Sequence, residues 1–356
     1  MTKKYPQQWL VYRLSALGDV VLTTGVLDYL HSRFGWTFVV VTRAPWISVF
    51  DGHPAVQKVI GLENHELKMP KMLGVFARIV REFKDFGLLD LHGTLRSHIL
   101  STMWQGRAFS RFSVATIRHY PKFSVQRRRF LQQSNENGKA KYSAELLKYN
   151  VPQRYTMSVL PTPPDRNELV PMIMLSENER QVGQDFLRHT LNMHGEGEKS
   201  GPLVALHPYS THPHKAWLPA YWQELAEKLT EHGIAYFVVG RGDMVIQNPR
   251  ADFTNATSLR ETCALLAEAD VLVTGDSGPM HLASAVKTPV VALFGPTTKE
   301  WGFFPEGNDD IILENKELSC RPCSLHGSKA CTHDGACMKS LTPHMVLEAV
   351  QSILNK

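Results

Sequence analysis

The sequence predicts an α/β protein of two domains, each built around a parallel β-sheet. The first observation is an alternation of short aliphatic, β-branched runs with amphipathic helical stretches, which occurs in both halves of the chain. Strands and helices that alternate at this spacing are typical of βαβ units. The second observation is the length, because 356 residues can form two domains with separate cores.

Seven runs are expected to form strands. In the first half they are WLVYRL from Trp9, TFVVVT from Thr37 and GLLDLHG from Gly87. In the second half they are LVALHP, AYFVVG, VLVTGD and PVVALFG. Helices are expected over residues 19–34, 70–83, 94–104, 219–232, 258–268 and 279–286. Open α/β sheets bind ligands at the carboxyl ends of their strands, so we expect functional residues in the loops there.

A proline-rich stretch, VPQRYTMSVLPTPPDRNELVP, lies between the two halves. Proline fixes φ and removes a backbone donor, and the stretch lacks a helix or strand pattern, so it is predicted to be a linker. It separates an N-terminal domain over residues 1–160 from a C-terminal domain over residues 170–342. Two α/β domains joined in this way are expected to face an interdomain cleft, which is a favoured place for a pocket.

The composition is that of a globular protein, with 43% hydrophobic and 21% charged residues. No apolar run is long enough to span a bilayer and no signal peptide is recognisable, which predicts a cytoplasmic protein without a transmembrane segment. The net charge is +5, and residues 118–129 (RHYPKFSVQRRR) carry five Lys/Arg and no acid. This stretch indicates either a solvated loop or an electropositive surface for a phosphate- or carboxylate-rich partner.

Asp19 is the candidate catalytic group of the first loop, RLSALGDVVLTTGVL. An aspartate in the first turn of a helix complements the helix dipole, which is the ordinary reason for its presence. The functional interpretation is a carboxylate that takes a proton from an attacking hydroxyl. The loop has neither G-x-G-x-x-G nor a Walker A pattern, which argues against a dehydrogenase and a P-loop NTPase.

The segment VLVTGDSGPMHLASA predicts a second site at the start of a helix. Asp276 or Ser277 caps this helix, and Gly278 lies in its first turn, so free backbone N–H groups there can bind an anion. Asp276 would repel a phosphate and is better suited to sugar hydroxyls. His281, on the same helix, is either a packing residue or a phosphate contact.

Two further loops carry candidate ligand contacts. In LHPYSTHPHKAWLPAYW, the hydroxyls of Ser210 and Thr211 and the ammonium of Lys215 could hold a diphosphate and offset leaving-group charge. Ordinary turn chemistry, with Trp217 as a packing residue, is the alternative. In FVVGRGD, Gly240 allows the backbone to approach a flat ligand such as a nucleobase.

Taken together, these segments resemble the heptosyltransferases of glycosyltransferase family 9 over residues 9–350. GDSGPMHLASA with TPVVALFGPT resembles the C-terminal signature of that family, and RLSALGDVVLTTGVL resembles its opening loop and helix. LLDLHGTLRS, SVQRRRFL and HKAWLPAYW resemble further segments of the family.

The resemblance implies a GT-B architecture of two Rossmann-like domains, with the acceptor on the first and the donor on the second. A final helix over about residues 343–355 is expected to pack back onto the first domain. The implied reaction is inverting transfer of heptose from ADP-heptose to Kdo-lipid A or heptosyl-Kdo-lipid A, in Gram-negative lipopolysaccharide biosynthesis. No cofactor or metal is required, and the sequence has no acidic D-x-D motif.

Site residues follow from the same resemblance. Asp19 matches the general base. The donor-binding positions are Ser210, Thr211, Lys215, Trp217, Gly240, Asp243, Asp276, Ser277, Gly278 and His281. The acceptor-binding positions are Arg96, Arg127 and Arg128. The basic stretch then has an anionic lipid A–Kdo acceptor at the inner membrane leaflet as its partner, rather than nucleic acid, and the enzyme would be peripheral to that membrane.

The chain departs from the family pattern at two places. Gly25 stands where the family usually has proline, a change that we interpret as affecting only the shape of the helix. After FVVGRGD the family usually has a glutamate for the ribose, whereas this chain has Met244, with Asp243 as the nearest carboxylate. The second departure leaves the identity of the nucleotide open.

Four of the five cysteines form the pattern C-x2-C-x7-C-x5-C. They are Cys320, Cys323, Cys331 and Cys337. The pattern superficially resembles a zinc site, but the second pair is widely spaced, so reduced thiols or a disulfide are favoured over a structural metal.

Three alternatives remain open at this point. One is a family-9 transferase that uses a different nucleotide sugar. Another is a UDP-sugar 2-epimerase on the same fold, which needs no acceptor surface and so leaves the basic stretch unexplained. The third is a non-enzymatic protein that binds nucleic acid or anionic membranes through residues 118–129. The sequence does not specify which core heptose would be added, or the oligomeric state.

Overall fold

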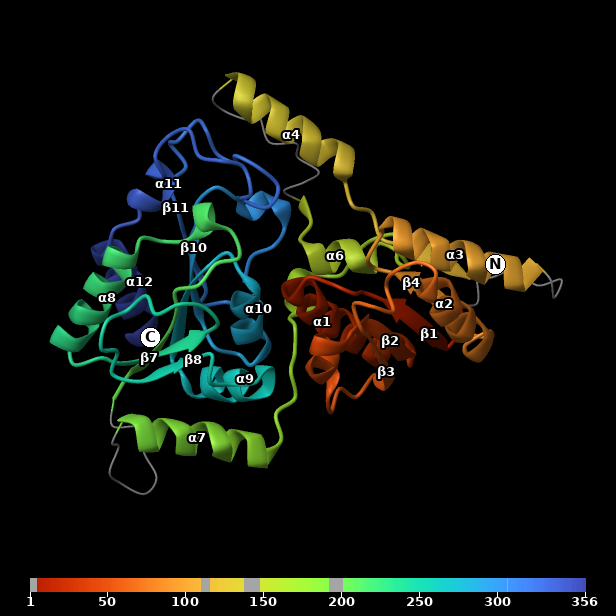
Figure 1. Cartoon of the computed structure of the whole chain (residues 1–356), viewed down its shortest axis with the longest axis horizontal. Helices are drawn as coiled ribbons and strands as arrows, with labels where there is room; N and C mark the ends of the chain where they lie inside the picture. Colours follow the sequence, from red (N-terminus) through yellow and green to blue (C-terminus); the bar gives the residue numbers. More distant parts are fainter. Residues whose placement is uncertain (1–4, 110–115, 138–147, 192–200, 306) are drawn as a thin grey trace. The chain divides into compact units, whose positions relative to one another are not determined.

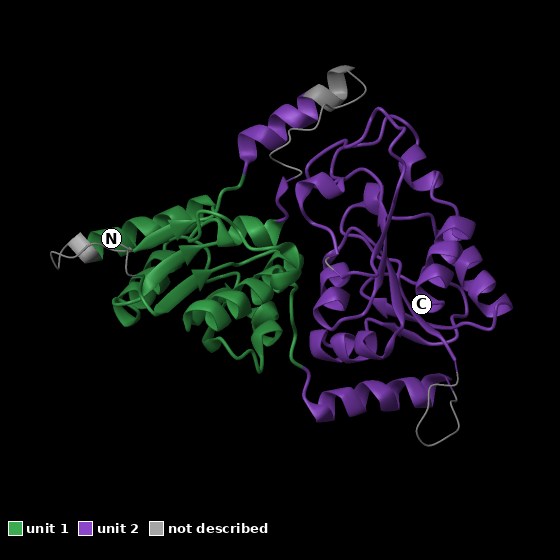
Figure 2. Ribbon diagram, turned by 180° about the vertical axis from the view of Figure 1, so that it is seen from behind, with its two compact units in different colours: residues 1–122, 151–174 green, residues 123–150, 175–356 purple. Residues whose placement is uncertain are grey.

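The computed structural model describes residues 5–109, 116–137, 148–191, 201–305 and 307–356. The chain divides into two compact units (Figure 2). Unit 1 comprises Met1–Lys122 and Val151–Met174, and unit 2 comprises Phe123–Asn150 and Leu175–Lys356. Among the described residues, no helix is both long enough and apolar enough to cross a membrane.

Unit 1 contains a parallel sheet of five strands (Figure 1). The strands are β1 (Gln8–Tyr12), β2 (Thr37–Arg43), β3 (Val56–Leu62), β4 (Gly87–Asp90) and β5 (Ile117–His119). Their order is β3-β2-β1-β4-β5. β2 and β3 are added on one side of β1, and β4 and β5 on the other side. The order of the strands therefore reverses between β1 and β4, where Tyr12 lies opposite Asp90 in the parallel pair. This topological switch point is where ligands bind in such sheets, at the carboxyl ends of the strands.

The helices of unit 1 follow its strands. They are α1 (Leu17–Phe34), α2 (Lys71–Glu82), α3 (Leu95–Phe109), α6 (Val151–Thr156) and the 3-10 turns η1 (Ala44–Phe50) and η2 (Arg166–Leu169). Gly35 ends α1 in the left-handed conformation, with φ 69°. The buried side of α2, formed by Met72, Phe76, Ile79 and Val80, packs against side chains of β1 and β2.

The prediction of a linker between the domains is wrong. Residues 151–171 contain α6 and η2, which both pack on α1 within unit 1, and Val151, Tyr155 and Leu169 are buried. A Cβ atom built on Gly25 would lie 2.5 Å from the Leu169 carbonyl oxygen and closer still to that of Val170. Gly25 therefore makes room for a neighbouring backbone, which corrects the interpretation that it affects only the shape of the helix.

Unit 2 contains a second parallel sheet, of six strands. The strands are β6 (Leu203–His207), β7 (Ala235–Gly240), β8 (Asp252–Thr254), β9 (Val271–Gly275), β10 (Val290–Phe294) and β11 (Ile311–Glu314). The order β11-β10-β9-β6-β7-β8 is that of a Rossmann fold, with its switch point between β6 and β9. The predicted fold class, two Rossmann-like parallel sheets with helices, is confirmed.

The helices of unit 2 include two that contact each other around a glycine. The elements are α4 (Ser124–Asn137), α7 (Glu177–Leu191), α8 (Pro219–Glu231), α9 (Leu259–Glu268), α10 (Gly278–Ala285), α11 (Ala336–Lys339), α12 (Pro343–Leu354), η3 (Pro213–Lys215) and η4 (Lys299–Trp301). Gly183 of α7 lies against the backbone of Ala264 in α9. Arg260 of α9 forms two hydrogen bonds to Glu179, of 2.7 and 2.6 Å, which lower the pKa of Glu179 to about 2.

The final helix differs from the expectation that it packs back onto the first domain. α12 lies beside α8 in unit 2 (Figure 1). Its apolar residues Val346, Leu347 and Val350 belong to the same core cluster as Trp222 of α8. This face is already covered inside unit 2, which is the physical reason for the difference.

Gly25→Ala should destabilise the protein by about 1–3 kcal/mol, because its methyl group would meet two backbone carbonyls that cannot move independently. Gly74→Ala is the matched control, since Gly74 also lies inside a helix, and nothing lies within 4 Å of a Cβ built there. We expect the control to be neutral or stabilising by up to about 1 kcal/mol. Urea unfolding of both variants measures the difference, and equal effects would contradict the account of Gly25.

Candidate active site

Asp19 lies at the switch point of unit 1, in the first turn of α1. Its Oδ2 atom accepts a hydrogen bond of 3.1 Å from the backbone N–H of Ala16. Its Oδ1 atom accepts one of 2.9 Å from the hydroxyl of Tyr155. These hydrogen bonds hold the carboxylate in place. The side chain is 16% exposed, so it remains accessible at the surface.

Arg13 forms a group with Asp19 and Tyr155, and it was not among the site residues predicted from the sequence. Its guanidinium is buried, forms an ion pair with Asp19 and donates a hydrogen bond to the Leu91 carbonyl. Burial opposes the charge of Arg13, but the Asp19 carboxylate more than compensates, so the pKa of Arg13 lies above its usual value. Burial raises the pKa of Tyr155, which keeps its hydroxyl protonated as a donor to Asp19.

The loop after β4 contributes a neutral histidine to the same edge of the sheet. Asp90 is buried, and its Oδ1 atom accepts hydrogen bonds from the backbone N–H groups of His92 (2.9 Å) and Gly93 (2.8 Å). Burial, followed by the charges of Arg13 and Lys122, lowers the pKa of His92 to about 4. This imidazole is therefore uncharged at neutral pH.

Lys215 and Asp276 meet at the switch point of unit 2. The Lys215 ammonium lies 2.8 Å from Asp276 Oδ2, which also accepts a hydrogen bond of 2.7 Å from Thr297. The two charged side chains are 15% and 17% exposed. Lys215 follows β6, Asp276 follows β9 and Thr297 follows β10, so the parallel sheet brings three distant segments to one edge.

Ser277 and Gly278 open α10 beside this pair. Ser277 is the N-cap residue, but its hydroxyl does not cap the helix; it lies 3.1 Å from the hydroxyl of Thr274 instead. Thr274 is also 2.9 Å from Nδ1 of His207. Burial lowers the pKa of His207 to about 4, so this imidazole is neutral. The first turn of α10 thus presents backbone N–H groups without a side-chain cap, which suits an anion.

Two of the predicted donor contacts, Trp217 and His281, are buried. Trp217 is 3% exposed and donates a hydrogen bond of 2.8 Å from Nε1 to the Leu341 carbonyl. It packs edge-on against Trp222, with ring centroids 4.9 Å apart. His281 is also 3% exposed and lies inside α10. Trp217 belongs to the core cluster of unit 2, which gives it a packing role, whereas the contact of His281 with the donor stays a prediction.

Gly240 and Gly242 have a local explanation that does not require a nucleobase. They have φ angles of 130° and 158°, and Cβ atoms built on them would lie 2.5 and 2.6 Å from the Tyr209 ring. The Tyr209 hydroxyl lies 2.7 Å from that of Thr254. The neighbouring Asp243 is exposed. The glycines therefore allow Tyr209 to pack over the end of β7, and the role of Gly240 and Asp243 in donor binding stays a prediction.

The remaining predicted positions are exposed or only partly covered. Ser210 donates a hydrogen bond of 3.1 Å to the His212 carbonyl, and Thr211 is exposed. Arg96 is exposed on the first turn of α3, in unit 1. Arg127 and Arg128 belong to α4 of unit 2, not to the first domain in which the sequence placed them. The guanidinium of Arg127 lies 5.8 Å from the centre of the Phe303 ring.

The cysteine cluster holds free thiols. All five cysteines lie within the described part of the chain, and none of them forms a disulfide. Within that part, the sulfur atoms do not come together as a metal-binding group; the single group of that kind comprises Asp90, His98 and His119. Burial and the neighbouring cysteines raise the pKa of Cys323 to about 11. The free cysteines agree with reduced thiols rather than with a disulfide.

The buried neutral His207 predicts a loss of stability in acid. The unfolded chain takes up a proton near the ordinary pKa of 6.5, whereas the folded chain does so only near 4. The free energy of unfolding therefore falls as the pH is lowered from about 6.5 to 4, by up to about 1.4 kcal/mol per pH unit for this group. His207→Gln should show a shallower slope in denaturant unfolding at a series of pH values. Identical slopes for wild type and His207→Gln would contradict the assignment.

Comparison with known proteins identifies the family to which the chain is similar. Residues 129–332 match the sequence model of glycosyltransferase family 9 (heptosyltransferase). A lipooligosaccharide heptosyltransferase 2 of Campylobacter jejuni is 31% identical over 152 residues, which cover 39% of this chain and 47% of that relative. The chain thus spans about half the length of this relative. Lipooligosaccharide heptosyltransferase 2 of Haemophilus influenzae is 25% identical over 98% of this chain and 99% of its own length.

Among solved structures, the E. coli heptosyltransferase WaaC with ADP superimposes with a TM-score of 0.62 at 16% identity. The match covers 97% of this chain and 99% of that chain, and at this identity it shows a shared fold. The family model spans more than half of the chain and includes the loops at the switch point of unit 2. The resemblance inferred from the motifs is confirmed: the chain belongs to glycosyltransferase family 9, the heptosyltransferase family.

Proposed function

We propose that this chain transfers heptose, with inversion, from ADP-heptose to the inner core of lipopolysaccharide, with Kdo-lipid A or heptosyl-Kdo-lipid A as the acceptor. The observation that carries the proposal is the cation of Lys215 beside the uncapped N-terminus of α10, at the switch point of unit 2. The names of the Campylobacter and Haemophilus relatives support the heptosyl group, and the ADP bound by the E. coli protein supports the nucleotide.

Lys215 and α10 are assigned to the departing diphosphate. An ammonium has three N–H donors, so its contact with Asp276 leaves capacity for phosphate oxygens. The backbone N–H groups of Gly278 and its neighbours add the positive end of the helix dipole. Together they would offset the negative charge that develops as the bond from sugar to phosphate breaks. This set of donors supplies positive charge without a metal ion, so we expect donor binding to be independent of magnesium.

Asp19 is assigned to the acceptor. In an inverting transfer, one base removes the proton from the attacking hydroxyl while the diphosphate leaves from the opposite face of the sugar. Tyr155 and the Ala16 N–H fix the two oxygens of the Asp19 carboxylate, and Arg13 fixes its position. A base that is oriented in this way loses less entropy when the acceptor hydroxyl approaches.

The basic residues are assigned to the anionic acceptor. Arg96 lies on α3 of unit 1, and Arg127 and Arg128 lie on α4. Phosphate and carboxylate groups of a lipid A–Kdo acceptor are suitable partners for guanidinium groups. Because that acceptor is anchored in the inner leaflet, the enzyme would act in the cytoplasm as a peripheral protein at the inner membrane. This arrangement also explains why no nucleic acid is needed to account for the basic stretch.

The proposal is tested by titrating the protein calorimetrically with ADP, UDP and GDP, with and without magnesium. We expect ADP to bind in the micromolar range, with the same affinity in magnesium and in its absence. Lys215→Ala should weaken ADP binding by about 10- to 100-fold, which corresponds to the loss of a charge-assisted phosphate contact. Lys228→Ala, which removes a surface lysine paired with Glu224 in α8, is the matched control and should bind ADP normally.

Different outcomes overturn different parts of the proposal. Preferred binding of UDP or GDP would contradict ADP-heptose as the donor and would favour another nucleotide sugar. Binding of ADP that is equal in wild type and Lys215→Ala would contradict the assigned diphosphate site. Failure to bind any nucleotide would contradict the transferase proposal as a whole.

A further inference from the structure

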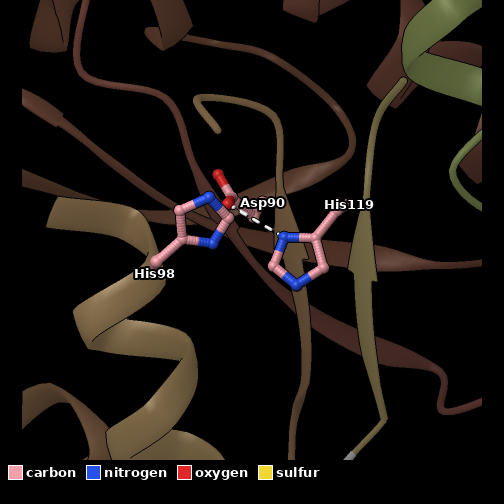
Figure 3. A group of neighbouring side chains, drawn as sticks. All are labelled: Asp90, His98 and His119. Carbon is pink, nitrogen blue, oxygen red and sulfur yellow. Dashed lines mark hydrogen bonds and ion pairs between the residues drawn. The ribbon is translucent and has the colours of Figure 1, made fainter. Parts of the chain in front are cut away.

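Asp90, His98 and His119 form a group to which the proposed transfer assigns no role (Figure 3). One ligand atom from each residue can be chosen so that all three lie within 4.8 Å of one another. Two imidazole nitrogens and one carboxylate oxygen are the ligand types that bind divalent transition metals. Among the described residues, no other group of three His, Cys, Asp or Glu side chains meets this condition.

Three separate elements of unit 1 bring the group together. Asp90 ends β4 and His119 ends β5, and the two residues lie directly opposite each other in the parallel ladder. His98 comes from α3, which starts two residues after Gly93. Gly93 has φ 57°, the left-handed conformation that lets the chain turn sharply from strand into helix. Figure 3 shows the two imidazole rings on either side of the Asp90 carboxylate.

The carboxylate of Asp90 is oriented before any ion arrives. The residue is 0% exposed, and its Oδ1 atom is held by the backbone N–H groups of His92 and Gly93. Its Oδ2 atom lies 3.0 Å from Nδ1 of His119. Two ligands bound to one ion at about 2.0–2.1 Å lie roughly 3 to 3.4 Å apart, so this spacing already suits coordination. The backbone contacts to Oδ1 are the kind of outer interaction that fixes a metal ligand.

We propose that Asp90, His98 and His119 bind one divalent transition-metal ion of the zinc class. The ion would displace to solvent the proton that His119 Nδ1 donates to Asp90 Oδ2, and His98 would supply the third ligand. Three protein ligands leave at least one coordination position, and the exposure of His98 and His119 opens it to solvent. Water or an anionic group, phosphate or carboxylate, would complete the coordination.

Nearby positive charge sets the expected strength of the site. Lys122 donates a hydrogen bond of 2.7 Å to the Gly93 carbonyl, and Arg96 lies on the first turn of α3. Asp90 is the single carboxylate among the ligands, so we expect weaker binding than in a site with two carboxylates. The same cations would favour an anion as the outer ligand. No step of the proposed transfer is assigned to this ion. The proposed metal site therefore does not depend on which nucleotide sugar the protein uses.

The test is a titration of tag-free, metal-free protein with Co²⁺, followed by its visible absorption. We expect one equivalent to bind with the spectrum of nitrogen and oxygen ligands. His98→Ala and His119→Ala should each weaken binding at least tenfold. His344→Ala is the matched control, because His344 is an exposed histidine on α12, and it should bind like wild type. Far-ultraviolet circular dichroism of the metal-free variants establishes that each one is folded.

The same experiment distinguishes Co²⁺ bound at the two histidines from Co²⁺ bound at the cysteine cluster. Thiolate ligands give Co²⁺ an additional charge-transfer band in the near ultraviolet, and Cys320→Ser with Cys323→Ser would remove it. A second measurement needs no variant: bound Zn²⁺ should protect His98 and His119 of the wild type from diethylpyrocarbonate, read by mass spectrometry. The proposal is overturned if both histidine variants bind Co²⁺ as tightly as wild type, if the spectrum is that of thiolates, or if Zn²⁺ gives no protection.

Discussion

The buried ion pair of Arg13 and Asp19 is the interaction on which the organisation of unit 1 depends. A guanidinium in the interior is costly unless a carboxylate and further acceptors surround it. Here Asp19, at the start of α1, and the carbonyl of Leu91, after β4, supply those acceptors. Tyr155 adds a hydrogen bond to Asp19 from the segment after residue 150. One ion pair, with its hydrogen bonds, thus joins residues 13–19 to Leu91 and to Tyr155, three segments that are far apart in the sequence.

This pairing has a consequence for the interpretation of Asp19. Removing the carboxylate leaves the guanidinium of Arg13 buried and without its counter-charge, a change that typically costs about 3–5 kcal/mol. Asp19 is therefore both a structural residue and the proposed base. Asp19→Asn keeps the shape of the side chain but also removes the counter-charge of Arg13, so the folding of this variant has to be measured alongside its activity.

Unit 2 uses the same topological principle with a different set of contacts. Asp276 is held by Lys215 and Thr297, and the loop that carries Thr297 is held in turn by Arg321. Arg321 donates to the carbonyls of Phe294 (3.1 Å) and Thr297 (3.0 Å) and pairs with Glu314. A Cβ atom built on Gly327 would lie 2.7 Å from Lys215 Cδ. The cysteine-rich segment thus packs against Lys215 and supports the proposed diphosphate site.

The sequence predicted the interior of both sheets and missed their edges. All seven predicted strands exist, whereas β3, β5, β8 and β11, which were not predicted, are the outermost strands of the two sheets. An interior strand is buried on both faces and appears as a continuous apolar run, but an edge strand such as Asp252–Thr254 is short and partly polar. Pairing with a neighbouring strand, which the local sequence does not encode, determines these elements.

The residues of the candidate site also divide into those that the sequence could predict and those that it could not. Asp19, Lys215 and Asp276 could be predicted because each follows a strand that could be recognised. Arg13 and Tyr155 could not be predicted in this way. Arg13 falls within the run WLVYRL, which was predicted to be a strand, and Tyr155 lies in the proline-rich segment that was predicted to be a linker. The proximity of Asp90, His98 and His119 depends on the register of β5, an edge strand. Contacts that depend on tertiary packing were therefore the ones that sequence patterns did not reveal.

The most direct test of the central claim is a transfer assay with Asp19→Asn, ADP-heptose and Kdo-lipid A, alongside calorimetric binding of ADP. Wild type should form the heptosylated product. If Asp19 is the base, the variant should bind ADP within about twofold of wild type and transfer heptose at least about 100-fold more slowly, the range expected for loss of a general base. A folded variant that retains more than about a tenth of wild-type turnover would contradict the assignment of Asp19 and, with it, the proposed mechanism.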